Sequence, residues 1–286
     1  MYNLEWEEEV ENLKMAMNKP FLKWAGGKAK LVPFILHNLP TQSHNRLIEP
    51  FAGSAALSLA SNFDAYLLND KNADLIGLFQ MLKQEKQLFI DYARSFFIAA
   101  NNEETRFYEL REQFNYSQEL AERSALFIYL NRHAFNGLCR YNSKGLFNVP
   151  FGRYKVPYFP EVEMQGFIDK SDRIELMCDD FEAALALAGN DDIVYCDPPY
   201  VPLSDTASFT TYASGGFDLH DQSRLAEVAK QVSEESKGVL ISNHDTKFTR
   251  EIYKEARLEA IDVQRNIAAK GSSRKKVGEL LAIYGE

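Results

Sequence analysis

The sequence Asp197-Pro198-Pro199-Tyr200 brings together a carboxylate, two residues that lack a backbone N–H, and an aromatic ring. It follows the apolar run Ile193 to Cys196, which predicts a buried parallel strand, and open α/β sheets bind ligands at the carboxyl ends of such strands. A residue before proline favours extended backbone, and prolines offer carbonyl acceptors without donors. Acceptors beside an aromatic ring suit a planar substrate with an exocyclic amino group, such as adenine. From these four residues alone, a surface turn with a packed tyrosine is the alternative.

A second group of residues lies at an earlier strand-to-helix junction, Glu49 to Gly53, where a glycine lets the backbone approach a ligand. Asp70 ends the next expected strand, and in dinucleotide folds an acid at a similar position binds ribose hydroxyls. The sequence has no G-x-G-x-x-G motif, so a nucleoside ligand without a pyrophosphate fits better than NAD. For Gly53 by itself, an ordinary tight turn is the alternative.

Alternating strand and helix patterns position both groups. The expected strands cover residues 46–49, 66–70, 174–178, 193–196, 238–242, 258–263 and 280–284, and the expected helices cover 29–38, 55–61, 73–83, 181–188, 221–236 and 246–256. The last two strands are expected to form a hairpin. Residues 84–131 show helical, amphipathic patterns, whereas 132–160 are rich in Asn, Gly, Arg, Tyr and Pro, as in a structured loop or hairpin. We therefore expect an α/β fold, a Rossmann-like sheet with a helical insertion at about 74–160.

Composition excludes several classes of protein. The chain has 286 residues with 45% hydrophobic and 26% charged residues, as in a globular protein with an ample core. It shows no apolar run long enough for a membrane span, and the acidic segment 1–18 lacks the apolar centre of a secretion signal. The three isolated cysteines fit a reducing cytoplasm and argue against a disulfide framework or a cysteine-rich zinc site.

The net charge of −9 is unevenly distributed along the chain. Residues 123–155 and 265–276 carry several Lys and Arg and no acid, whereas residues 1–18 are strongly acidic. Local basic stretches matter more than the total charge for contact with phosphates, so the two stretches favour a nucleic-acid partner. Ordinary solvated faces are the alternative for either stretch alone.

Six segments together resemble the Dam-type DNA adenine-N6 methyltransferases of the D12 class, from Pro20 to about Tyr284. They are FLKWAGGK (21–28), IEPFAGSAALSL (48–59), LNRHAFNGLCRYNSKGLFNVPFGRYKVPYFPE (130–161), VYCDPPYVPLS (194–204), LISNHDT (240–246) and RKKVGELLAIY (274–284). The resemblance implies a class I methyltransferase sheet with a helical target-recognition insertion. The catalytic domain would cover 19–73 and 161–286, and the DNA target-recognition domain 74–160. Residues 1–18 form an acidic extension without a counterpart in the family.

The resemblance implies S-adenosyl-L-methionine as methyl donor, and no metal. The implied donor-binding residues, by position, are Trp24, Ala25, Lys28, Glu49, Phe51, Gly53, Asp70, Asp180, Phe181 and Asp197. Asp70 would hold the ribose hydroxyls, and Asp180 with Phe181 would lie near the adenine ring of the donor. The family often has F-x-G-x-G, but here Ala55 replaces the second glycine. We expect donor binding to survive this change if the φ of Ala55 is negative.

The implied chemistry is methyl transfer to an adenine amino group by Asp197, Pro198, Pro199 and Tyr200. In our reading Asp197 and the carbonyl of Pro198 each accept one amino hydrogen, which aims the nitrogen lone pair at the methyl group. Tyr200 would stack on the adenine, which has to be flipped out of the duplex. No base is needed before attack, so His133 and His244 are expected to be structural.

The resemblance also assigns DNA contacts. Arg140 would read a guanine, Leu138 and Pro150 would touch a thymine methyl, and Lys23 would contact a second guanine. Phe135 would fill the gap left by the flipped base, where many relatives have Tyr. The other implied contacts, to phosphates or base edges, are Arg132, Asn136, Asn142 and Tyr154, with Lys144, Arg153 and Lys155 as further phosphate contacts. These similarities favour GATC as the target, read on double-stranded DNA by a single subunit.

Two alternatives stay open from the sequence. One is an RNA or protein amino-methyltransferase of the same fold, and the other is a catalytically inactive DNA-binding relative. The biological role is also open between replication timing and repair, phage-borne defence, and partnership with a restriction nuclease.

Overall fold

The computed structural model describes residues 19–40, 45–201, 217–264 and 276–285. The acidic extension 1–18 and most of the basic stretch 265–276 lie outside the described residues. Within the described part of the chain, no helix is both long and apolar enough to cross a membrane.

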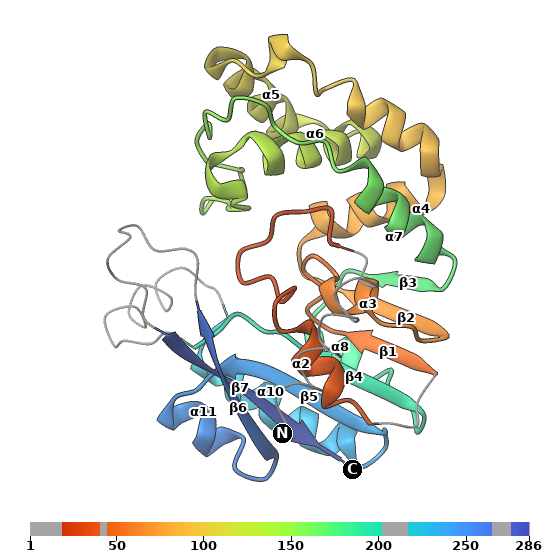
Figure 1. Ribbon diagram of the computed structural model, residues 1–286, viewed down its shortest axis with the longest axis vertical. Coiled ribbons are helices and arrows are strands. Elements are labelled where there is room, and N and C mark those ends of the chain that lie inside the picture. The colour runs from red at the N-terminus through yellow and green to blue at the C-terminus, as the bar shows by residue number, and fades with distance from the viewer. Residues whose placement is uncertain (1–18, 41–44, 202–216, 265–275, 286) are drawn as a thin grey trace, which may run out of the picture. The chain divides into compact units, whose positions relative to one another are not determined.

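Seven strands form one sheet in the order β3-β2-β1-β4-β5-β7-β6 (Figure 1). They are β1 (Arg46–Glu49), β2 (Ala65–Asn69), β3 (Ile174–Met177), β4 (Asp192–Cys196), β5 (Gly238–His244), β6 (Arg257–Gln264) and β7 (Lys276–Tyr284). Strand β4 pairs in parallel with β1 and with β5, and β2 pairs in parallel with β3, whereas β7 runs antiparallel to both β5 and β6. The expected α/β sheet and its closing hairpin are therefore confirmed.

The strand order reverses between β1 and β4, which are paired in parallel. Such a reversal is where open α/β sheets bind ligands, beyond the carboxyl ends of the strands. Both chemical groups found in the sequence follow these two strands, since Glu49 ends β1 and Asp197 follows β4.

The contacts divide the chain into two compact units. The first holds the described residues up to His37 together with 52–178, and the second holds Asn38 to Phe51 and the described residues from Asp179 onward.

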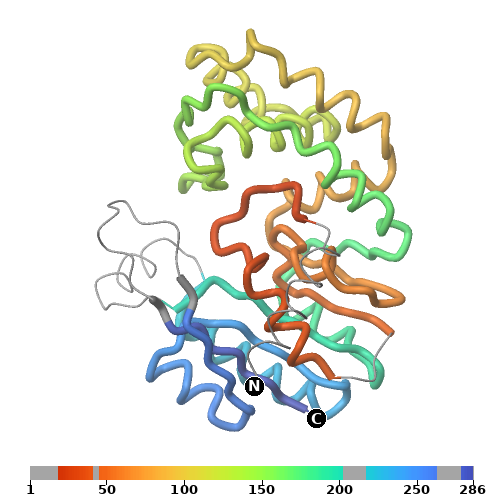
Figure 2. Tube along the Cα trace, in the orientation of Figure 1, coloured from red at the N-terminus to blue at the C-terminus, as the bar shows by residue number. Residues whose placement is uncertain are grey.

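The first unit is mainly helical. Its helices are α2 (Val32–His37), α3 (Ala56–Ala60), α4 (Ala73–Arg94), η1 (Ala99–Asn101), α5 (Glu104–Tyr116), α6 (Leu120–His133), η2 (Phe135–Gly137) and α7 (Glu161–Ser171). In Figure 2 the chain leaves β2 in orange, runs through the helices from α4 to α7 in orange, yellow and light green, and reaches β3 in green. Phe79 and Phe167 stack at 4.9 Å between ring centroids, and Phe21 contacts both edge-on, so α4, α7 and the N-terminal segment share an aromatic core.

Local sequence explains where these elements begin. The side chain of Asn72 caps α4 by accepting from the N–H groups of Asp74 and Leu75. Between His133 and Phe151 the chain forms two isolated antiparallel bridges, Ala134 with Phe151 and Tyr141 with Phe147. This agrees with the structured loop expected at 132–160.

The second unit contains the buried centre of the sheet. Every residue of β4 and β5 is buried, which accounts for their nearly unbroken apolar sequences. Its helices are α8 (Phe181–Leu185), α10 (Leu219–Ser233) and α11 (Lys247–Ile252). Asp218 with Asp221, and Thr246 with Thr249, form capping boxes at the starts of α10 and α11.

Four helical predictions were wrong in extent, among them α2, which covers Val32–His37 rather than 29–38. Helix α4 continues past residue 83 to Arg94, across a kink at Lys86, where φ is 47°. Helices α8 and α11 are shorter than expected, and α7 was not predicted at all. The acidic first turn of α7, Glu161 and Glu163, follows Pro160 directly, which is typical of the start of a helix. This helix was not predicted because the preceding loop is rich in proline.

Candidate active site

Asp197, Pro198, Pro199 and Tyr200 directly follow buried strand β4, between the neighbours β1 and β5. This confirms the expected position at the carboxyl end of a central parallel strand. One oxygen of the Asp197 carboxylate, Oδ1, is buried, and Pro198 is buried as well. The loop is thus built into the sheet rather than lying as a surface turn.

Two buried amides hold the loop on either side of Tyr200. The Gln222 side chain donates to the carbonyl of Pro199 at 2.6 Å, and the N–H of Val201 donates to Asn243 Oδ1 at 3.1 Å. The two amides are joined to each other, since Asn243 Nδ2 donates to Gln222 Oε1 at 2.9 Å. These bonds leave the loop little freedom to move along the strand axis.

The ring of Tyr200 is fixed by a cross-strand pair. Its hydroxyl donates to Glu279 Oε2 at 2.7 Å, and its ring meets His244 at 4.7 Å between centroids, nearly perpendicular. His244 on β5 lies directly opposite Glu279 on β7 in the antiparallel register. Burial, followed by the charge of Asp197, raises the pKa of Tyr200 well above its ordinary value, so the hydroxyl stays protonated.

His244 is structural, as expected. Its Nδ1 contacts the Val201 carbonyl at 2.6 Å, and the residue is buried. It therefore fixes the segment that follows Tyr200 and does not face a reacting group.

Buried carboxylates make the end of β4 electronegative. Burial, followed by the charges of Asp197 and Glu49, raises the pKa of the Cys196 thiol. Glu49 is itself buried at the end of the neighbouring strand β1. The two acids thus set a negative potential at the point where the strand order reverses.

Three aromatic rings lie beside this point. Phe51 and Phe181 stack with centroids 5.4 Å apart, and Phe217 contacts both rings edge-on. Two of these residues were predicted from the sequence to bind the donor, and the structure brings them together. Phe217 was missed because it follows a segment without a recognisable pattern.

Asp180 is held by an arginine that the sequence did not single out. Arg224 donates to both carboxylate oxygens of Asp180, at 3.1 and 3.2 Å, and its guanidinium lies 4.3 Å from the Phe181 ring centroid. Burial lowers the pKa of Arg224, but the bonds to Asp180, Glu182 and Asp221 outweigh burial and raise it overall. Asp180 also caps α8 through the N–H of Glu182.

In the first unit, Asp70 closes the glycine turn. Its two oxygens accept the N–H groups of Gly53 at 3.0 Å and Asn72 at 2.9 Å. Burial raises the pKa of Asp70, and these two hydrogen bonds partly offset the rise. A carboxylate oxygen accepts more than one hydrogen bond, so Asp70 retains capacity for a hydroxyl ligand.

Gly53 is required by its surroundings. Its φ is +47°, and a Cβ there would lie 2.8 Å from Nε1 of Trp24. Of the other residues predicted in this region, Lys28 is buried and donates from Nζ to the Gly26 carbonyl at 2.6 Å, whereas Ala25 is exposed.

Ala55 does not have the backbone that we expected. Its φ is +55° and its ψ is +35°, the left-handed region, so the condition of a negative φ fails. Ala55 is fully buried, however, and its methyl group packs into the protein.

Lys23 lies against the recognition segment of the same unit. Asn131 accepts from the N–H of Lys23 at 2.9 Å and donates to its carbonyl at 2.7 Å, and Lys23 Nζ lies 4.3 Å from the centroid of the Tyr154 ring. Burial, followed by the charge of Arg132, lowers the pKa of Lys23. The structure therefore joins Lys23, the predicted contact outside the insertion, to residues within it.

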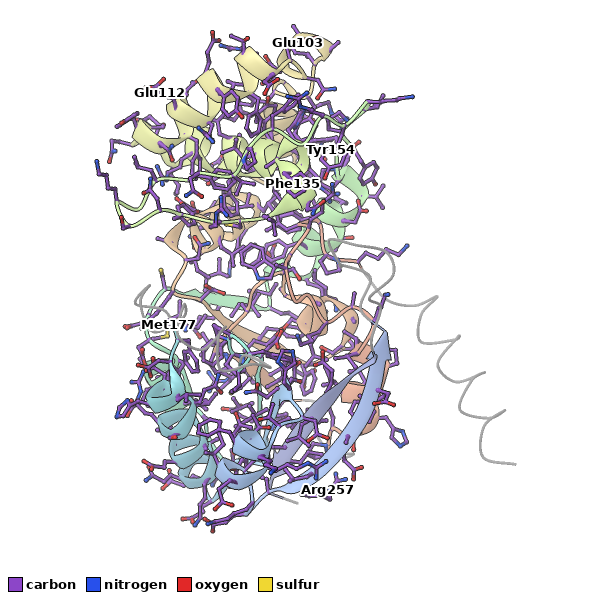
Figure 3. All side chains as sticks on the ribbon, turned by 90° about the vertical axis from the view of Figure 1, so that its left-hand side faces the viewer. Glu103, Glu112, Phe135, Tyr154, Met177 and Arg257 are labelled. Carbon is purple, nitrogen blue, oxygen red and sulfur yellow. The ribbon has the colours of Figure 1, made fainter. Side chains whose placement is uncertain are left out.

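Phe135 and Tyr154 lie on adjoining segments, both labelled in Figure 3. The Ala134–Phe151 bridge and the hydrogen bond from Gly152 N–H to the His133 carbonyl, 2.8 Å, tie the two segments together. Phe135 is 51% exposed although it is fully apolar, and its N–H donates to the Pro150 carbonyl at 2.8 Å. Asn136, which follows it, is exposed in a left-handed conformation at φ 55°.

Arg140 is exposed on the arm that leads into the hairpin turn, and one neighbour orients it. Its Nε donates to Asn148 Oδ1 at 2.8 Å. On either side, Cys139 and Tyr141 point inward, and Tyr141 donates to Asp74 at 2.6 Å. Leu138, the residue before Cys139, is half-buried.

Two of the predicted DNA contacts have structural roles. Asn142 Oδ1 accepts from the N–H groups of Lys144 and Leu146 and shapes the hairpin turn. Arg132 is buried and donates to the Phe21 carbonyl, so in this conformation little of its guanidinium faces outward. A phosphate contact by Arg132 would require its side chain to move.

His133 is also structural, as expected. It is buried, stacks on Tyr129 at 3.9 Å between centroids, and its Nδ1 contacts the Tyr129 carbonyl at 2.8 Å. Burial lowers its pKa to about 4, partly offset by the hydrogen bond to Tyr129. It is therefore neutral at ordinary pH.

Sequence reasoning missed the residues that hold the site from a distance: Gln222, Glu279, Arg224 and Asn131. Each lies within a regular helix or strand, and although Asn131 and Glu279 fall in segments that resemble the family, no local pattern showed which groups they contact. Only the Asn of LISNHDT gave a signal, because Asn243 falls in a polar sequence at the end of an apolar strand.

The chain is similar to known proteins over most of its length. The DNA adenine methylase of Vibrio cholerae is 47% identical over 271 residues, covering 94% of this chain and 97% of that protein. The DNA adenine methylase of Escherichia coli K12 is 47% identical over 270 residues, covering 94% and 96%, and that of Serratia marcescens is 49% identical, covering 94% and 100%.

Among solved structures, a putative RNA methyltransferase from Pyrococcus horikoshii aligns over 99% of this chain and 98% of its own, with a TM-score of 0.43 and 9% identity. The profile of the D12 class N6 adenine-specific DNA methyltransferases matches residues 24–267, and the chain therefore belongs to this family of enzymes.

Proposed function

We propose that this enzyme methylates the N6 amino group of an adenine flipped out of duplex DNA, within GATC, using S-adenosyl-L-methionine. The observation that carries the proposal is the position and hydrogen bonding of the Asp197 to Tyr200 loop. The Pro199 carbonyl is already bonded to Gln222, while Asp197 and Pro198 lie at the end of β4. The domains are assigned as 19–73 and 161–286 for catalysis and 74–160 for target recognition, in a single subunit.

The residues present fit the methyl donor. When bound, S-adenosyl-L-methionine supplies a methyl group on a positively charged sulfur. The stacked Phe51 and Phe181 suit a purine ring, and Asp180, fixed by Arg224, offers an acceptor for its amino group. The negative potential from Glu49 and Asp197 suits the positive sulfur.

In the first unit, Asp70 and Gly53 would hold the ribose end of the donor. Asp70 keeps acceptor capacity after its two backbone bonds, and the absence of a side chain at Gly53 leaves the turn open beside Trp24. Lys28 and Ala25 belong to the same loop as Trp24.

Two acceptors activate the adenine amino group. Its lone pair is delocalised into the ring, so the nitrogen is a poor nucleophile until both hydrogens are held out of the ring plane. We assign one hydrogen to Asp197 and the other to the carbonyl of Pro198, the residue next to it at the end of β4, whereas the Pro199 carbonyl already accepts a bond from Gln222. The carboxylate also favours the positive charge that develops on nitrogen as the bond to carbon forms. The amino proton leaves afterwards.

Tyr200 holds the base for this step by stacking. The perpendicular contact with His244 leaves at least one face of the Tyr200 ring for the adenine. Its proton is bonded to Glu279, so Tyr200 does not act as a base.

The recognition segment would read the sequence. Arg140 bonded through Nε keeps its two terminal nitrogens for the acceptors of a guanine, the bidentate geometry of the major groove. The exposed ring of Phe135 supports its role as the wedge that fills the space of the flipped base. Lys23, Asn136, Leu138, Pro150 and Tyr154 surround these two residues in the same segment or against it.

The first experiment is methyl transfer onto an unmethylated plasmid, with the modified positions sequenced. Marks at the adenine of every GATC site support both the chemistry and the assignment of Arg140. Marks in another motif keep the chemistry and overturn the specificity. No marks, with donor binding demonstrated, would contradict the proposal and move the substrate to RNA or protein.

A further inference from the structure

The Tyr200 hydroxyl is committed to a carboxylate on a distant strand. Glu279 Oε2 accepts it at 2.7 Å, and Glu279 is buried although it carries an acidic side chain. The two residues are 79 positions apart in the chain. No feature of the amino-group chemistry described above uses Glu279, so its burial needs a separate reason.

The register of the sheet places this carboxylate. Glu279 lies opposite His244, and these two side chains contact the hydroxyl and the ring of Tyr200 respectively. The backbone on both sides of Tyr200 is held as well, through Pro199 and Val201. Tyr200 is thus held at its ring by His244, at its hydroxyl by Glu279, and through the backbone on both sides.

We infer that Glu279 is a positioning residue for methyl transfer, which fixes the plane of the Tyr200 ring and enriches its face with electron density. The inference rests on the proposed stacking of Tyr200 on the target adenine. A phenol that donates to a carboxylate gains negative charge on oxygen and shares it with the ring. The face of an aromatic ring is already negative and attracts cations.

We expect the bond between Tyr200 and Glu279 to affect the rate of methyl transfer rather than the binding of the adenine. The adenine is neutral when it stacks and becomes cationic as the methyl group is transferred. An electron-rich face therefore binds the transition state more strongly than the ground state, which raises the rate constant of the chemical step. The raised pKa of Tyr200 keeps its proton available for Glu279 at working pH.

Three variants separate the parts of this role. Tyr200→Phe removes the donor but keeps the ring, Glu279→Leu removes the acceptor, and Glu279→Gln keeps a neutral acceptor of the same shape. Tyr195→Phe is the matched control, because it removes an equally buried hydroxyl contact, to Ser242 at 2.8 Å between β4 and β5, and leaves the bond between Tyr200 and Glu279 in place. Each folded variant is measured for single-turnover methylation of a GATC duplex, for donor affinity, and for fluorescence of a duplex with 2-aminopurine at the target position.

We expect Tyr200→Phe and Glu279→Leu each to lower the single-turnover rate by about tenfold, the effect of roughly 1.4 kcal/mol on a barrier. The double variant should be no slower than either single one, because both remove the same interaction. Glu279→Gln should give the same 2-aminopurine fluorescence as the wild type. Its single-turnover rate should lie between that of the wild type and that of Glu279→Leu. Donor affinity should stay within twofold throughout, and Tyr195→Phe should match the wild type.

Additive losses in the double variant, or a normal rate in Glu279→Leu, would overturn the inference. A rate loss that follows thermal stability equally in Tyr195→Phe and Glu279→Leu would also overturn it, since the effect would then be structural. Failure of the proposed function is distinguishable, because the wild-type enzyme would then place no methyl group on adenine.

Discussion

The side-chain amide of Gln222 donates to the carbonyl of Pro199 at 2.6 Å, and this bond distinguishes two otherwise equivalent proline carbonyls in the loop. Pro199 is engaged from within the protein, which leaves the role of acceptor to Pro198. Gln222 is buried on α10 and also accepts from Asn243, so one side chain couples the loop to the end of β5.

Replacement of Gln222 by Met keeps the volume and removes both hydrogen-bonding groups. We expect stability to fall by about 1–3 kcal/mol, because Asn243 Nδ2 loses a buried hydrogen bond and the Pro199 carbonyl loses a part-buried one. The rate of methyl transfer should fall with it, while DNA affinity is kept. Chemical denaturation and single-turnover assays test this, with Gln231→Met, an exposed position on the same helix, as control. Equal effects at both positions would contradict the role of Gln222.

Asp197→Ala should abolish turnover and spare most of the DNA affinity. In the proposed mechanism the carboxylate acts on the amino group, on its developing charge and on the positive sulfur of the donor, and loss of one such electrostatic group costs about 10²- to 10³-fold in rate. Methyl transfer and fluorescence anisotropy with a GATC duplex measure the two effects separately. The exposed Asp191 lies just before β4, and Asp191→Ala serves as control. Turnover near the wild-type rate in Asp197→Ala would falsify the mechanism.

Substitutions at Gly53 and Ala55, two residues of the glycine turn, are expected to differ in their effect on stability. Gly53→Ala should destabilise the protein by about 2 kcal/mol or more, because its φ of +47° disfavours a side chain and the new Cβ meets Trp24 at 2.8 Å. Tryptophan fluorescence should report the displacement of Trp24.

Ala55→Gly should change stability by less than about 1 kcal/mol. Release of the left-handed strain gains about 1–2 kcal/mol, while the buried methyl group and the looser unfolded chain each cost about 0.4–1 kcal/mol. Donor affinity should be unchanged, because the Ala55 methyl group is buried in the protein. A several-fold gain in donor affinity would show instead that Ala55 weakens the site.

Stability should decline on mild acidification because of His133. In the folded chain its pKa is lowered to about 4, from an ordinary value of 6.5, by burial above all. The unfolded chain therefore binds this proton first, and the stabilisation is complete above pH 6.5 and is lost as the pH falls toward 4. The shift corresponds to roughly 3 kcal/mol at about 1.4 kcal/mol per pKa unit.

Denaturation midpoints at pH 7.5 and pH 5 test this, with His133→Gln compared against His220→Gln, a change of an exposed histidine. His133→Gln should lower stability at pH 7.5 and flatten the pH dependence, and His220→Gln should leave the slope as in the wild type. An unchanged slope in His133→Gln would assign the acid sensitivity to other groups.

Arg140→Ala should relax specificity at one base of the target more than it weakens binding. A bidentate arginine contributes about 1–3 kcal/mol of discrimination against the wrong base. Sequencing of methylated plasmid should then reveal marks at near-cognate sites. Lys144→Ala, at an exposed lysine of the same hairpin, should instead reduce the salt dependence of binding without new marks. New marks with both variants would contradict the assignment of Arg140 to base reading and of Lys144 to phosphate contact.

Local pattern alone was enough for the architecture and the identity of the loop. The apolar run before Asp197 predicted a buried strand, and the alternating strands and helices predicted a parallel sheet with an antiparallel hairpin, because side-chain burial follows strand and helix periodicity. The segment 130–161 carried most of the resemblance to the family, because its residue types follow the family over 32 consecutive positions.

Only the tertiary structure decided which groups hold the loop and which remain for chemistry. Gln222 and Glu279 lie 23 and 79 residues from their partners Pro199 and Tyr200, and such pairs are set by helix packing and strand register. The same holds for the left-handed backbone of Ala55 and the burial of Arg132, because neither a residue's φ nor its exposure is written in its neighbours. The sequence names the reacting groups, and long-range packing sets their geometry.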